Sequence, residues 1–478
     1  MRNLTMLTDL YQMTMMNGYI QAGIPDRIAV FDLFYRKNPG NAAFAVAAGL
    51  EQVIDYIENL HFDAEDIAYL RSLNLFDEKF FDYLKNFRFT GEIYAMPEGT
   101  VVFPYEPLLR VKAPIFEAQL IETAMLNIVN HQTLIASKAA RVCQAAQGDL
   151  VMEFGLRRAQ GPDAGLYGAR AALIAGCGST SNVLAGKMFD VPVAGTHAHS
   201  WVMSFPDELT AFRAYADAYP DACLLLVDTY DVEQGIRNAI TVGLEMRARG
   251  ERLAGIRIDS GDLAWLAKMA RRMLDEAGLD DCGIVLSNDL DEYTIQSILD
   301  EGAPVSSWGV GTKLACAFDQ PTLGGVYKLS ATRAPGRAEW VDRLKISESA
   351  AKLTVPGVLD VRRYYNEDGT IAGDMVFDVN SGVDEGQVIV DPLDSMRRKK
   401  LAGKRFSTML EPLARNGQVV LDASDRSAME AQRRCREGLA CLDESQKRML
   451  NPHTYPVGLE YGLCERRRAL VGKLRGIA

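Results

Sequence analysis

Short apolar runs alternate with amphipathic helical patterns along the middle of this chain. From about Asp149 onward, each apolar run ends in a cluster of Gly, Ser, Asp or Thr residues, and a helical pattern follows it. Seven such run ends can be read: Glu153-Phe154-Gly155, Cys177-Gly178-Ser179, Gly195-Thr196-His197, Asp228-Thr229-Tyr230-Asp231, Asp259-Ser260-Gly261-Asp262, Ser287-Asn288-Asp289 and Gly309-Val310-Gly311-Thr312. This rhythm predicts successive βα units of a parallel barrel or sheet.

The spacing of these run ends supports that prediction. Asp228 and Asp259 are 31 residues apart and Asp259 and Asn288 are 29 apart, which is the length of a strand, a loop, a helix and a return. The helical pattern after Asp259 carries one apolar stripe that stops at Gly278 and consists of Leu263, Leu266, Ala270, Met273, Leu274 and Ala277. Parallel strands require crossover helices of this kind.

Both flanks of this region mix helix and strand. The pattern predicts a helix from Leu7 to Ile20, with Thr8 or Asp9 as N-cap, and an extended run over residues 27–35. Proline and glycine break residues 91–114 into a small β layer. Residues 355–390 are β-rich and are interpreted as a return to that layer, and the last 50 residues are charged and helical.

The expected fold is therefore α/β: an irregular parallel α/β barrel with an N-terminal mixed α/β layer to which the post-barrel β segment returns, plus C-terminal helices. The predicted domain boundaries are 1–120 for the N-terminal mixed domain, 121–345 for the barrel and 346–478 for the β return and helical segment. A chain of 478 residues with 48% hydrophobic residues is long enough to bury two or three cores.

Charge, cysteine content and the opening residues limit the partners and the cellular compartment that we expect for this protein. The formal net charge is −11, so no chain-wide basic field exists for nucleic acid or an anionic membrane, and we expect neither as a partner. The eight cysteines include no Cys-x-x-Cys pair and favour buried, reduced thiols. The opening residues 1–5 lead into a polar-studded helix without a signal-peptide core, and no later segment has membrane-spanning length. We expect a cytoplasmic protein.

Two histidines lie two residues apart at one of the seven run ends. His197 and His199 are two of five histidines in the chain and follow the apolar stretch Val191–Ala194. If that stretch is a strand, its period of two points both imidazoles to one face, where the strand gives way to a loop. The chemistry of α/β enzymes is located at such strand ends.

The other run ends carry complementary groups. Phe154 beside Arg157 and Arg158 suits a flat anionic ring, because stacking and charge-assisted hydrogen bonds act together. Backbone donors, a hydroxyl and an ammonium at the seventh run end predict a phosphate cradle if the next turn is helical, and carboxylates at the fourth and fifth run ends suit magnesium or sugar hydroxyls. These two groups are Gly309, Gly311, Thr312 and Lys313, and Asp228, Asp231, Asp259 and Asp262. Together they indicate a phosphorylated sugar meeting a small aromatic acid.

Each feature also has a plainer interpretation. A Gly-x-Gly-Thr turn is as often ordinary turn chemistry as a phosphate site, Asp-Ser-Gly-Asp is typical of a helix cap, and an arginine pair usually lies on a solvated face. A zinc-dependent amidohydrolase that binds metal through His197-x-His199 is the alternative enzyme class. Such sites need further histidines at later strand ends, whereas the remaining ones are His61, His131 and His453.

Several segments, in order along the chain, resemble the nicotinate phosphoribosyltransferase family. The likeness is dense to about residue 330, and its segments are Leu7–Gln12, Pro97–Thr100, Glu106–Val111, Glu153–Pro162, Gly195–Ser200, Arg257–Leu263, Gly309–Thr312 and Asn451–His453. The resemblance implies that nicotinate and phosphoribosyl pyrophosphate give nicotinate mononucleotide and pyrophosphate. It also implies that ATP hydrolysis is coupled to this reaction through a phosphorylated histidine, and that Mg²⁺ accompanies the phosphates.

The resemblance implies roles for individual residues. His199 corresponds to the phosphorylated histidine and belongs with Arg257 and Asp259 to the implied catalytic set; Asp259 takes ribose hydroxyls. The implied nicotinate contacts are the carboxylate-binding Arg257, Thr196 and Tyr11 and the ring-stacking Phe154. Phosphates or their metal fall to Arg157, Asp228, Gly311 and Thr312, with Asp228 as the implied metal ligand.

Two further implications concern specificity and assembly. Related nicotinamide-using enzymes carry an aspartate where Ser181 falls, and a carboxylate there would repel nicotinate, so a neutral serine favours the acid substrate. In the family the N-terminal helix, here carrying Tyr11, completes the pocket of a partner subunit, which implies a homodimer with shared active sites. A non-enzymatic nucleotide-binding homologue and a relative that uses quinolinate or nicotinamide are the alternatives within this resemblance.

Overall fold

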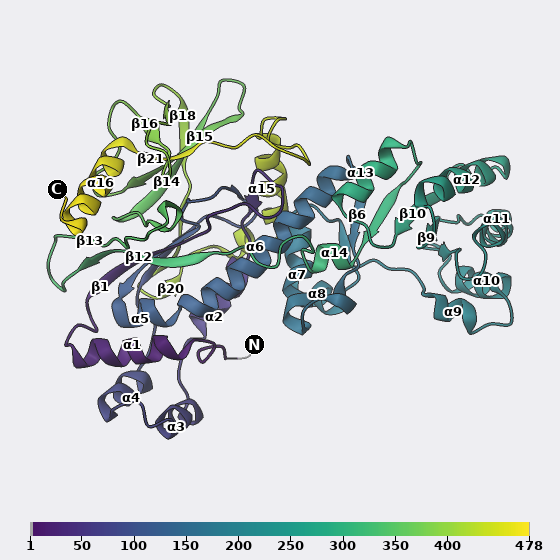
Figure 1. The fold of residues 1–478 in the computed structure, drawn as a ribbon. Helices are drawn as coiled ribbons and strands as arrows, with labels where there is room; N and C mark the ends of the chain where they lie inside the picture. Colours follow the sequence, from purple (N-terminus) through teal and green to yellow (C-terminus); the bar gives the residue numbers. More distant parts are fainter. Residues whose placement is uncertain (1–2, 478) are drawn as a thin grey trace. The chain divides into compact units, whose positions relative to one another are not determined.

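The chain divides into two compact units. The central unit is one continuous segment, Ile135–Pro321, and the terminal unit combines Met1–Leu134 with Thr322–Ala478. The computed structural model describes residues 3–477 (Figure 1), so Met1 and Arg2 of the opening stretch lie outside the described residues. The three-part division predicted at residues 120 and 345 stays a prediction.

The central unit is built on a six-stranded parallel sheet. Its strand order is β7-β6-β11-β10-β9-β8. The strands are β6 (Leu150–Glu153), β7 (Ser179–Thr180), β8 (Leu224–Leu226), β9 (Gly255–Ile258), β10 (Gly283–Ser287) and β11 (Ser307–Val310). Helices follow them in turn: α7 (Pro162–Ile174), α8 (Val183–Phe189), α9 (His199–Met203), α10 (Glu208–Ala218), α11 (Val232–Ala248), α12 (Leu263–Glu276), α13 (Glu292–Asp300) and α14 (Thr312–Ala315). The prediction of parallel βα units is confirmed.

The sheet is not closed. Beyond β7 the chain adds one bridge, Thr180 to Val193, and within residues 3–477 no backbone pairing joins that segment to β8. The condition that residues 191–194 form a strand is therefore met only by this single bridge. At the open seam the backbone N–H of Leu226 donates to His197 Nε2 over 3.2 Å, so a side chain takes the place of a strand partner.

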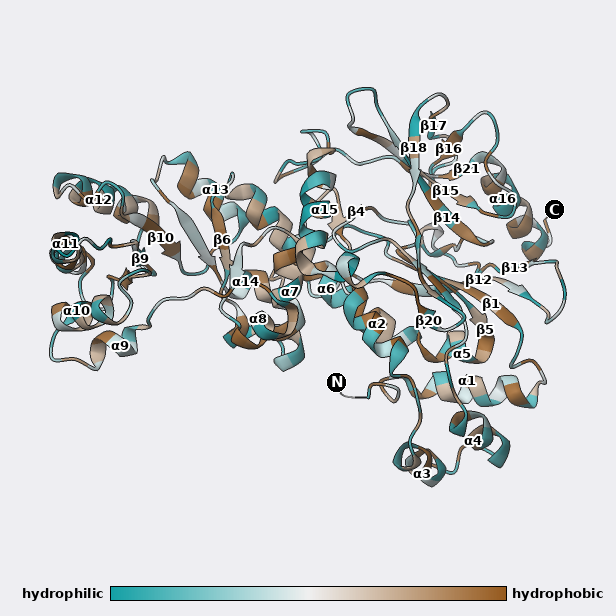
Figure 2. Ribbon diagram, turned by 180° about the vertical axis from the view of Figure 1, so that it is seen from behind, coloured by the Kyte–Doolittle hydropathy of each residue, from teal (hydrophilic) through white to brown (hydrophobic). Residues whose placement is uncertain are grey.

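The helices of the central unit are amphipathic as the sequence pattern requires. Helix α12 alternates hydrophilic and hydrophobic residues (Figure 2) and buries Leu263, Leu266 and Leu274. Its N-cap is Asp262, whose carboxylate accepts from the backbone N–H of Trp265 at 3.1 Å. The second aspartate of the Asp-Ser-Gly-Asp run is thus a helix cap, which leaves Asp259 as the carboxylate that faces the strand ends.

The terminal unit contains two larger sheets and a two-stranded one. The seven-stranded sheet has the order β13-β12-β1-β5-β3-β19-β20, from β1 (Ile28–Phe34), β3 (Glu92–Ala95), β5 (Leu109–Pro114), β12 (Val326–Arg333), β13 (Val341–Asp342), β19 (Glu411–Arg415) and β20 (Gln418–Val419). The six-stranded sheet has the order β17-β16-β21-β15-β14-β18, from β14 (Leu359–Tyr365), β15 (Ile371–Asp378), β16 (Val388–Val390), β17 (Arg398–Lys400), β18 (Arg405–Thr408) and β21 (Val457–Glu460). Strands β2 (Ala45–Val46) and β4 (Val101–Val102) form the small pair.

The interpretation of residues 355–390 as a return to the N-terminal layer is wrong. Strands β12, β13, β19 and β20 make that return, whereas β14, β15 and β16 build a sheet of their own. The sequence pattern shows that these segments are strands but does not say which edge each one pairs with. A turn at Asn366–Gly369 joins β14 to β15 within this sheet.

Helices complete the terminal unit. They are α1 (Leu10–Gln21), α2 (Leu50–Glu58), α3 (Ala64–Ser72), α4 (Glu78–Lys85), α5 (Ile115–Leu120), α15 (Ala428–Ala440) and α16 (Tyr461–Arg475), and α6 (Glu122–Ala145) runs from this unit into the central one. Helix α1 begins after the predicted N-cap Asp9 and packs on α5, which packs on β1 and β5 (Figure 1). In the described part of the chain no helix combines the length and apolar character needed to cross a membrane. No disulfide joins the eight cysteines, all of which lie among residues 3–477.

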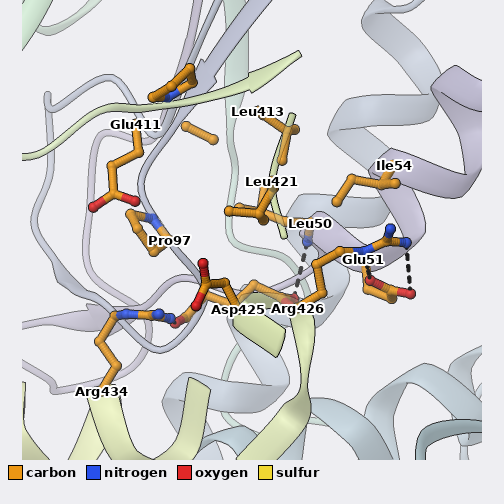
Figure 3. Close-up of a pocket in the computed structure, with 13 residues that line it drawn as sticks. Leu50, Glu51, Ile54, Pro97, Glu411, Leu413, Leu421, Asp425, Arg426 and Arg434 are labelled. Atoms are coloured by element: carbon orange, nitrogen blue, oxygen red, sulfur yellow. Dashed lines mark hydrogen bonds and ion pairs between the residues drawn. The ribbon is translucent and has the colours of Figure 1, made fainter. Parts of the chain in front are cut away.

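A cavity of about 250 Å³ lies in the terminal unit between α2, β19 and α15 (Figure 3). Leu50, Ile54 and Leu413 contribute apolar surface to it. Along its edge the Arg426 guanidinium donates two hydrogen bonds to the Glu51 carboxylate, at 2.9 and 3.1 Å. This bidentate pair fastens the C-terminal segment to α2.

A buried ion pair joins β14 to β15. The Arg363 guanidinium donates to the Asp374 carboxylate at 2.7, 3.0 and 3.1 Å, and the Tyr455 hydroxyl donates to the same carboxylate at 2.7 Å. Both side chains of the pair are nearly inaccessible to water. Burial and the Asp374 charge raise the pKa of the neighbouring Glu106 well above its usual range.

We expect Arg363→Met to destabilise the terminal unit by about 3–5 kcal/mol, because it leaves the Asp374 charge buried and unpaired. Denaturant unfolding of the full chain, followed by circular dichroism, measures this loss. The control is Arg397→Met, since the Arg397–Asp394 pair is largely exposed and contributes less than about 1 kcal/mol. Equal stabilities of the two variants would contradict the prediction.

Candidate active site

Arg257 is the centre of a cluster at the carboxyl ends of the central strands. It lies on β9, and its guanidinium donates to three side chains: Nε to Ser287 Oγ at 2.8 Å, one terminal nitrogen to Thr196 Oγ1 at 3.3 Å and the other to Asp259 Oδ1 at 3.1 Å. Its Cζ atom lies 5.7 Å from the centroid of the Phe154 ring. The cluster therefore holds a cation beside an aromatic face in one fixed orientation.

Asp228 connects this cluster to the next loop. Its Oδ2 atom accepts from the backbone N–H of Asp259 at 3.0 Å and from Ser260 Oγ at 2.6 Å. Its Oδ1 atom is buried and has no hydrogen-bond partner among the described residues. A buried carboxylate oxygen without a hydrogen-bond partner destabilises the fold. This atom is therefore available to bind a cation or to accept from a ligand's proton donor.

His199 is the first residue of α9 and lies beside Asp228. Its Nδ1 atom lies 3.2 Å from Thr229 Oγ1, and its Nε2 atom lies 4.0 Å from Asp228 Oδ1. The imidazole is 42% exposed, so a ligand can reach it. The imidazole is thus both oriented by neighbouring groups and open to solvent.

His197 and His199 do not share a face, contrary to the conditional prediction. His197 is buried, and its Nε2 accepts the Leu226 N–H at the seam described above. Burial lowers the pKa of His197 to about 4, which keeps the imidazole neutral and able to accept that bond. His197 therefore holds the segment that carries Thr196 and His199, and its Nε2 lone pair is not available to a metal ion.

We expect the free energy of unfolding to fall at acid pH, because His197 is buried in its neutral form. The folded pKa of about 4 lies below the usual value of 6.5 for a histidine in an unfolded chain, so between these values the unfolded chain binds a proton that the folded state excludes. Stability is lost as the pH falls through this window, by up to about 3 kcal/mol, and no contribution remains above it. His197→Gln, whose carbonyl can still accept the Leu226 N–H, should lose less stability between pH 7 and 4.

Urea unfolding of the wild type and His197→Gln at several pH values measures the difference. His61→Gln, at an exposed position, is the matched control and should follow the wild-type curve. A His197→Gln curve parallel to that of the wild type would contradict the assignment of His197 as the buried neutral group.

Phe154 is positioned by glycines on the neighbouring strand end. Its backbone N–H donates to Val310 O at 2.8 Å, and a Cβ on Gly309 would approach the Phe154 ring to 2.8 Å. Gly309 is therefore required for the ring to lie against β11. The preceding Glu153 is buried and accepts from Thr180 Oγ1 at 2.6 Å and from the Gly155 N–H, so it ties the Phe154 turn to β7.

The predicted phosphate cradle is followed by a helix, as its condition required. Gly311 is the N-cap of the short helix α14, and Thr312 is its first residue. Arg157 and Arg158 are both exposed on this turn, and Thr312 Oγ1 accepts from Arg158 at 3.1 Å. The structure thus joins Arg158, not Arg157, to Thr312.

The two remaining predicted residues, Ser181 and Tyr11, belong to other elements than the Arg257 cluster. Ser181 is half-buried at the end of β7, where its N–H donates to Glu153 O at 3.0 Å, and it precedes the α8 N-cap Asn182. Tyr11 belongs to the terminal unit, where it is 49% exposed on α1. Burial, Glu122 and Asp9 raise the pKa of Tyr11, so its hydroxyl stays a hydrogen-bond donor at neutral pH.

Three residues of the site were not predicted as functional: Ser287, Thr229 and Glu153. All three lie within one of the seven run ends, which was the available signal. What the sequence did not provide is the set of contacts, since the Arg257–Ser287 and Arg257–Thr196 bonds join positions 30 and 61 residues apart.

This arrangement, at the carboxyl ends of a parallel α/β sheet, is a candidate enzyme site suited to a small, flat anion. A guanidinium beside an aromatic ring can bind a planar carboxylate. The adjoining carboxylates can bind sugar hydroxyls, and the imidazole can interact with phosphoryl groups.

Comparison with known proteins gives the particular family. Models of the nicotinate phosphoribosyltransferase N-terminal domain, family and C-terminal domain match residues 6–130, 150–351 and 360–467. The nicotinate phosphoribosyltransferase of Bacillus subtilis is 44% identical over 96% of this chain and 93% of its own length. The crystal structure of human nicotinic acid phosphoribosyltransferase matches at a TM-score of 0.84 and 31% identity, over 97% of this chain and 99% of that chain. The chain belongs to the nicotinate phosphoribosyltransferase family.

Proposed function

We propose that this chain condenses nicotinate with phosphoribosyl pyrophosphate to give nicotinate mononucleotide and pyrophosphate, and that it couples this reaction to ATP hydrolysis through His199. One observation carries the proposal: Arg257, held by three side chains, faces the Phe154 ring within a chain that resembles the family along 96% of its length. A fixed guanidinium beside a ring suits an aromatic carboxylate such as nicotinate.

The sugar transfer needs positioning and charge more than covalent help. The bond from the ribose C1 atom to pyrophosphate breaks, and a bond from C1 to the pyridine nitrogen forms. Asp259 is assigned to the ribose hydroxyls, while Phe154 and Arg257 hold the ring so that its nitrogen points at C1. Thr312, Gly311 and Arg157, together with Arg158, are assigned to the phosphates, whose charge grows as pyrophosphate leaves.

His199 is assigned to the ATP step. The Asp228 carboxylate near Nε2 favours the tautomer with the proton on that atom, which leaves the Nδ1 lone pair beside the Thr229 hydroxyl. Nδ1 then attacks the γ-phosphorus, the bond to the ADP oxygen breaks, and a phosphohistidine forms. Its negative charge changes the electrostatics of the pyrophosphate site, and hydrolysis restores the imidazole.

Magnesium fits the residues present. The buried, unpartnered Oδ1 of Asp228 is the kind of hard oxygen that this ion binds, and Mg²⁺ is usually held by one or two carboxylates together with substrate phosphates. Asp228 is therefore assigned as its protein ligand. When bound, the ion supplies positive charge to the phosphate oxygens.

We also propose a homodimer with shared active sites. Helix α1 buries one face and exposes apolar side chains at Leu7, Leu10, Tyr11 and Met15, on and just before it. This spacing forms one stripe on the helix, which suits a second copy of the chain and presents Tyr11 to the partner's nicotinate.

Two further assignments belong to the proposal. The open parallel sheet is assigned to an irregular barrel whose strand ends form one rim. Ser181 is assigned the selection of the acid nicotinate over the amide nicotinamide.

The rival functions have weaker support. The amidohydrolase needs both imidazoles of His197-x-His199 on one metal, but His197 Nε2 accepts the Leu226 N–H. A non-enzymatic homologue lacks chemical residues while keeping binding ones, whereas His199, Arg257 and Asp259 are all present here. Quinolinate or nicotinamide as the substrate is separated from nicotinate by kinetics with the three pyridines.

The deciding experiment follows nicotinate mononucleotide formation from nicotinate and phosphoribosyl pyrophosphate with Mg²⁺, with and without ATP, while labelled γ-phosphate is traced onto the protein. Product that is stimulated by ATP, together with a labelled histidine, supports the proposal. Binding of both substrates without pyrophosphate release would refute it.

A further inference from the structure

Ser287 forms hydrogen bonds to both Arg257 and Asp259, which also bond each other directly. It is the last residue of β10 and is 2% exposed. Its Oγ accepts from Arg257 Nε at 2.8 Å and donates to Asp259 Oδ1. One hydroxyl therefore contacts both the group assigned to nicotinate and the group assigned to ribose.

The surroundings leave this hydroxyl little freedom. β10 pairs with β9 and places Val285 opposite Arg257, and a Cβ on Gly309 would lie 3.2 Å from Ser287 Cβ, so Ser287 is enclosed by the two neighbouring strands. Asn288 and Asp289, which follow it, have positive φ angles of 93° and 45°. The chain thus turns away at once, and the hydroxyl stays at the strand end.

We propose that Ser287 is a positioning residue for the transfer reaction, which fixes Arg257 and Asp259 relative to each other and so aligns nicotinate with the ribose. This inference rests on the proposed function. Without the hydroxyl, Arg257 loses its Nε acceptor and Asp259 loses a donor, so both side chains gain alternative orientations while their charges remain.

The kinetic signature differs from that of either partner. Ser287→Ala should lower kcat/KM for nicotinate and for phosphoribosyl pyrophosphate alike, by about 10- to 100-fold each, because a hydrogen bond to each charged group is lost. Arg257→Ala acts mainly on nicotinate. Ser287→Thr keeps the hydroxyl and should recover at least part of the loss.

A double-mutant cycle tests the coupling. If Ser287 acts through Arg257, then Ser287→Ala made in the Arg257→Ala background should leave the KM for nicotinate unchanged while still raising that for phosphoribosyl pyrophosphate. Additive effects on nicotinate would overturn the proposal, as would wild-type kinetics of Ser287→Ala. Ser306→Ala is the matched control, since Ser306 Oγ donates to Ile284 O at 2.9 Å at the other end of the same strands.

Two measurements separate the ways in which this test can fail. Thermal melting of each variant shows whether it is folded, and Ser287→Thr supplies a second variant if Ser287→Ala is not. Absence of nicotinate mononucleotide with the wild type refutes the proposed function itself. An active wild type with an unaffected Ser287→Ala refutes only the positioning role.

Discussion

His199→Ala should abolish the stimulation of turnover by ATP while leaving some uncoupled transfer of the phosphoribosyl group. The reason is that the phosphoryl acceptor is removed, whereas Arg257, Asp259 and Phe154 still bind and align the two substrates. We expect the ATP-dependent part of the rate to fall by roughly 100-fold or more, and labelling of the protein by γ-phosphate to fall to background. Initial rates with and without ATP, together with the label, measure both effects.

The control for this prediction is His61→Ala, which removes an exposed imidazole of the terminal unit. It should keep the wild-type ratio of rates with and without ATP. ATP stimulation that persists in His199→Ala would refute the assignment of the phosphorylated residue. If the variant instead loses transfer both with and without ATP, His199 has a role in substrate binding.

Arg257→Ala should raise the KM for nicotinate by roughly 10- to 150-fold, because a charge-assisted hydrogen bond to a carboxylate contributes about 1.5–3 kcal/mol. The KM for phosphoribosyl pyrophosphate should change far less, since Asp259 and the phosphate-binding turns remain. Initial rates with each substrate varied in turn measure the two constants.

The matched control is Arg249→Ala, which removes an arginine that pairs with Glu251 and Asp217 between α11 and β9. It should leave both constants unchanged. An equal rise of the two constants in Arg257→Ala would show that Arg257 supports the fold of the site rather than the nicotinate carboxylate.

Much of the central unit could be predicted from periodicity. The apolar runs and the stripe on α12 are local signals, because burial of a strand or a helix face depends on neighbouring residues in the chain. Strands β1, β3, β5 and β14 to β16 were also recognised, but the sheet of the last three was not, since they pair in a sheet of their own while β12 returns to β1. Pairing depends on contacts between distant segments, which a periodic pattern does not record.

The histidine pair illustrates the same limit within the site. The period-two rule requires a strand, and the segment before His197 makes a single bridge at Val193 and then a loop, so the two imidazoles diverge. His197 satisfies a backbone N–H that no strand reaches, and His199 opens a helix. A one-dimensional pattern could not assign these different roles, because the role of His197 depends on the N–H of Leu226, 29 residues away, which donates to the imidazole instead of to a strand.

The sequence by itself determined that βα units alternate through the middle of the chain and that their ends carry an imidazole, guanidiniums, carboxylates and an aromatic ring. Only the tertiary structure decided which of these side chains touch. The register that places Leu226 and Val285 on either side of Arg257 brings Ser287, Thr196 and Asp259 to one guanidinium. The physical reason is that hydrophobic periodicity encodes which face of an element is buried, whereas strand register and side-chain hydrogen bonds determine what that element meets.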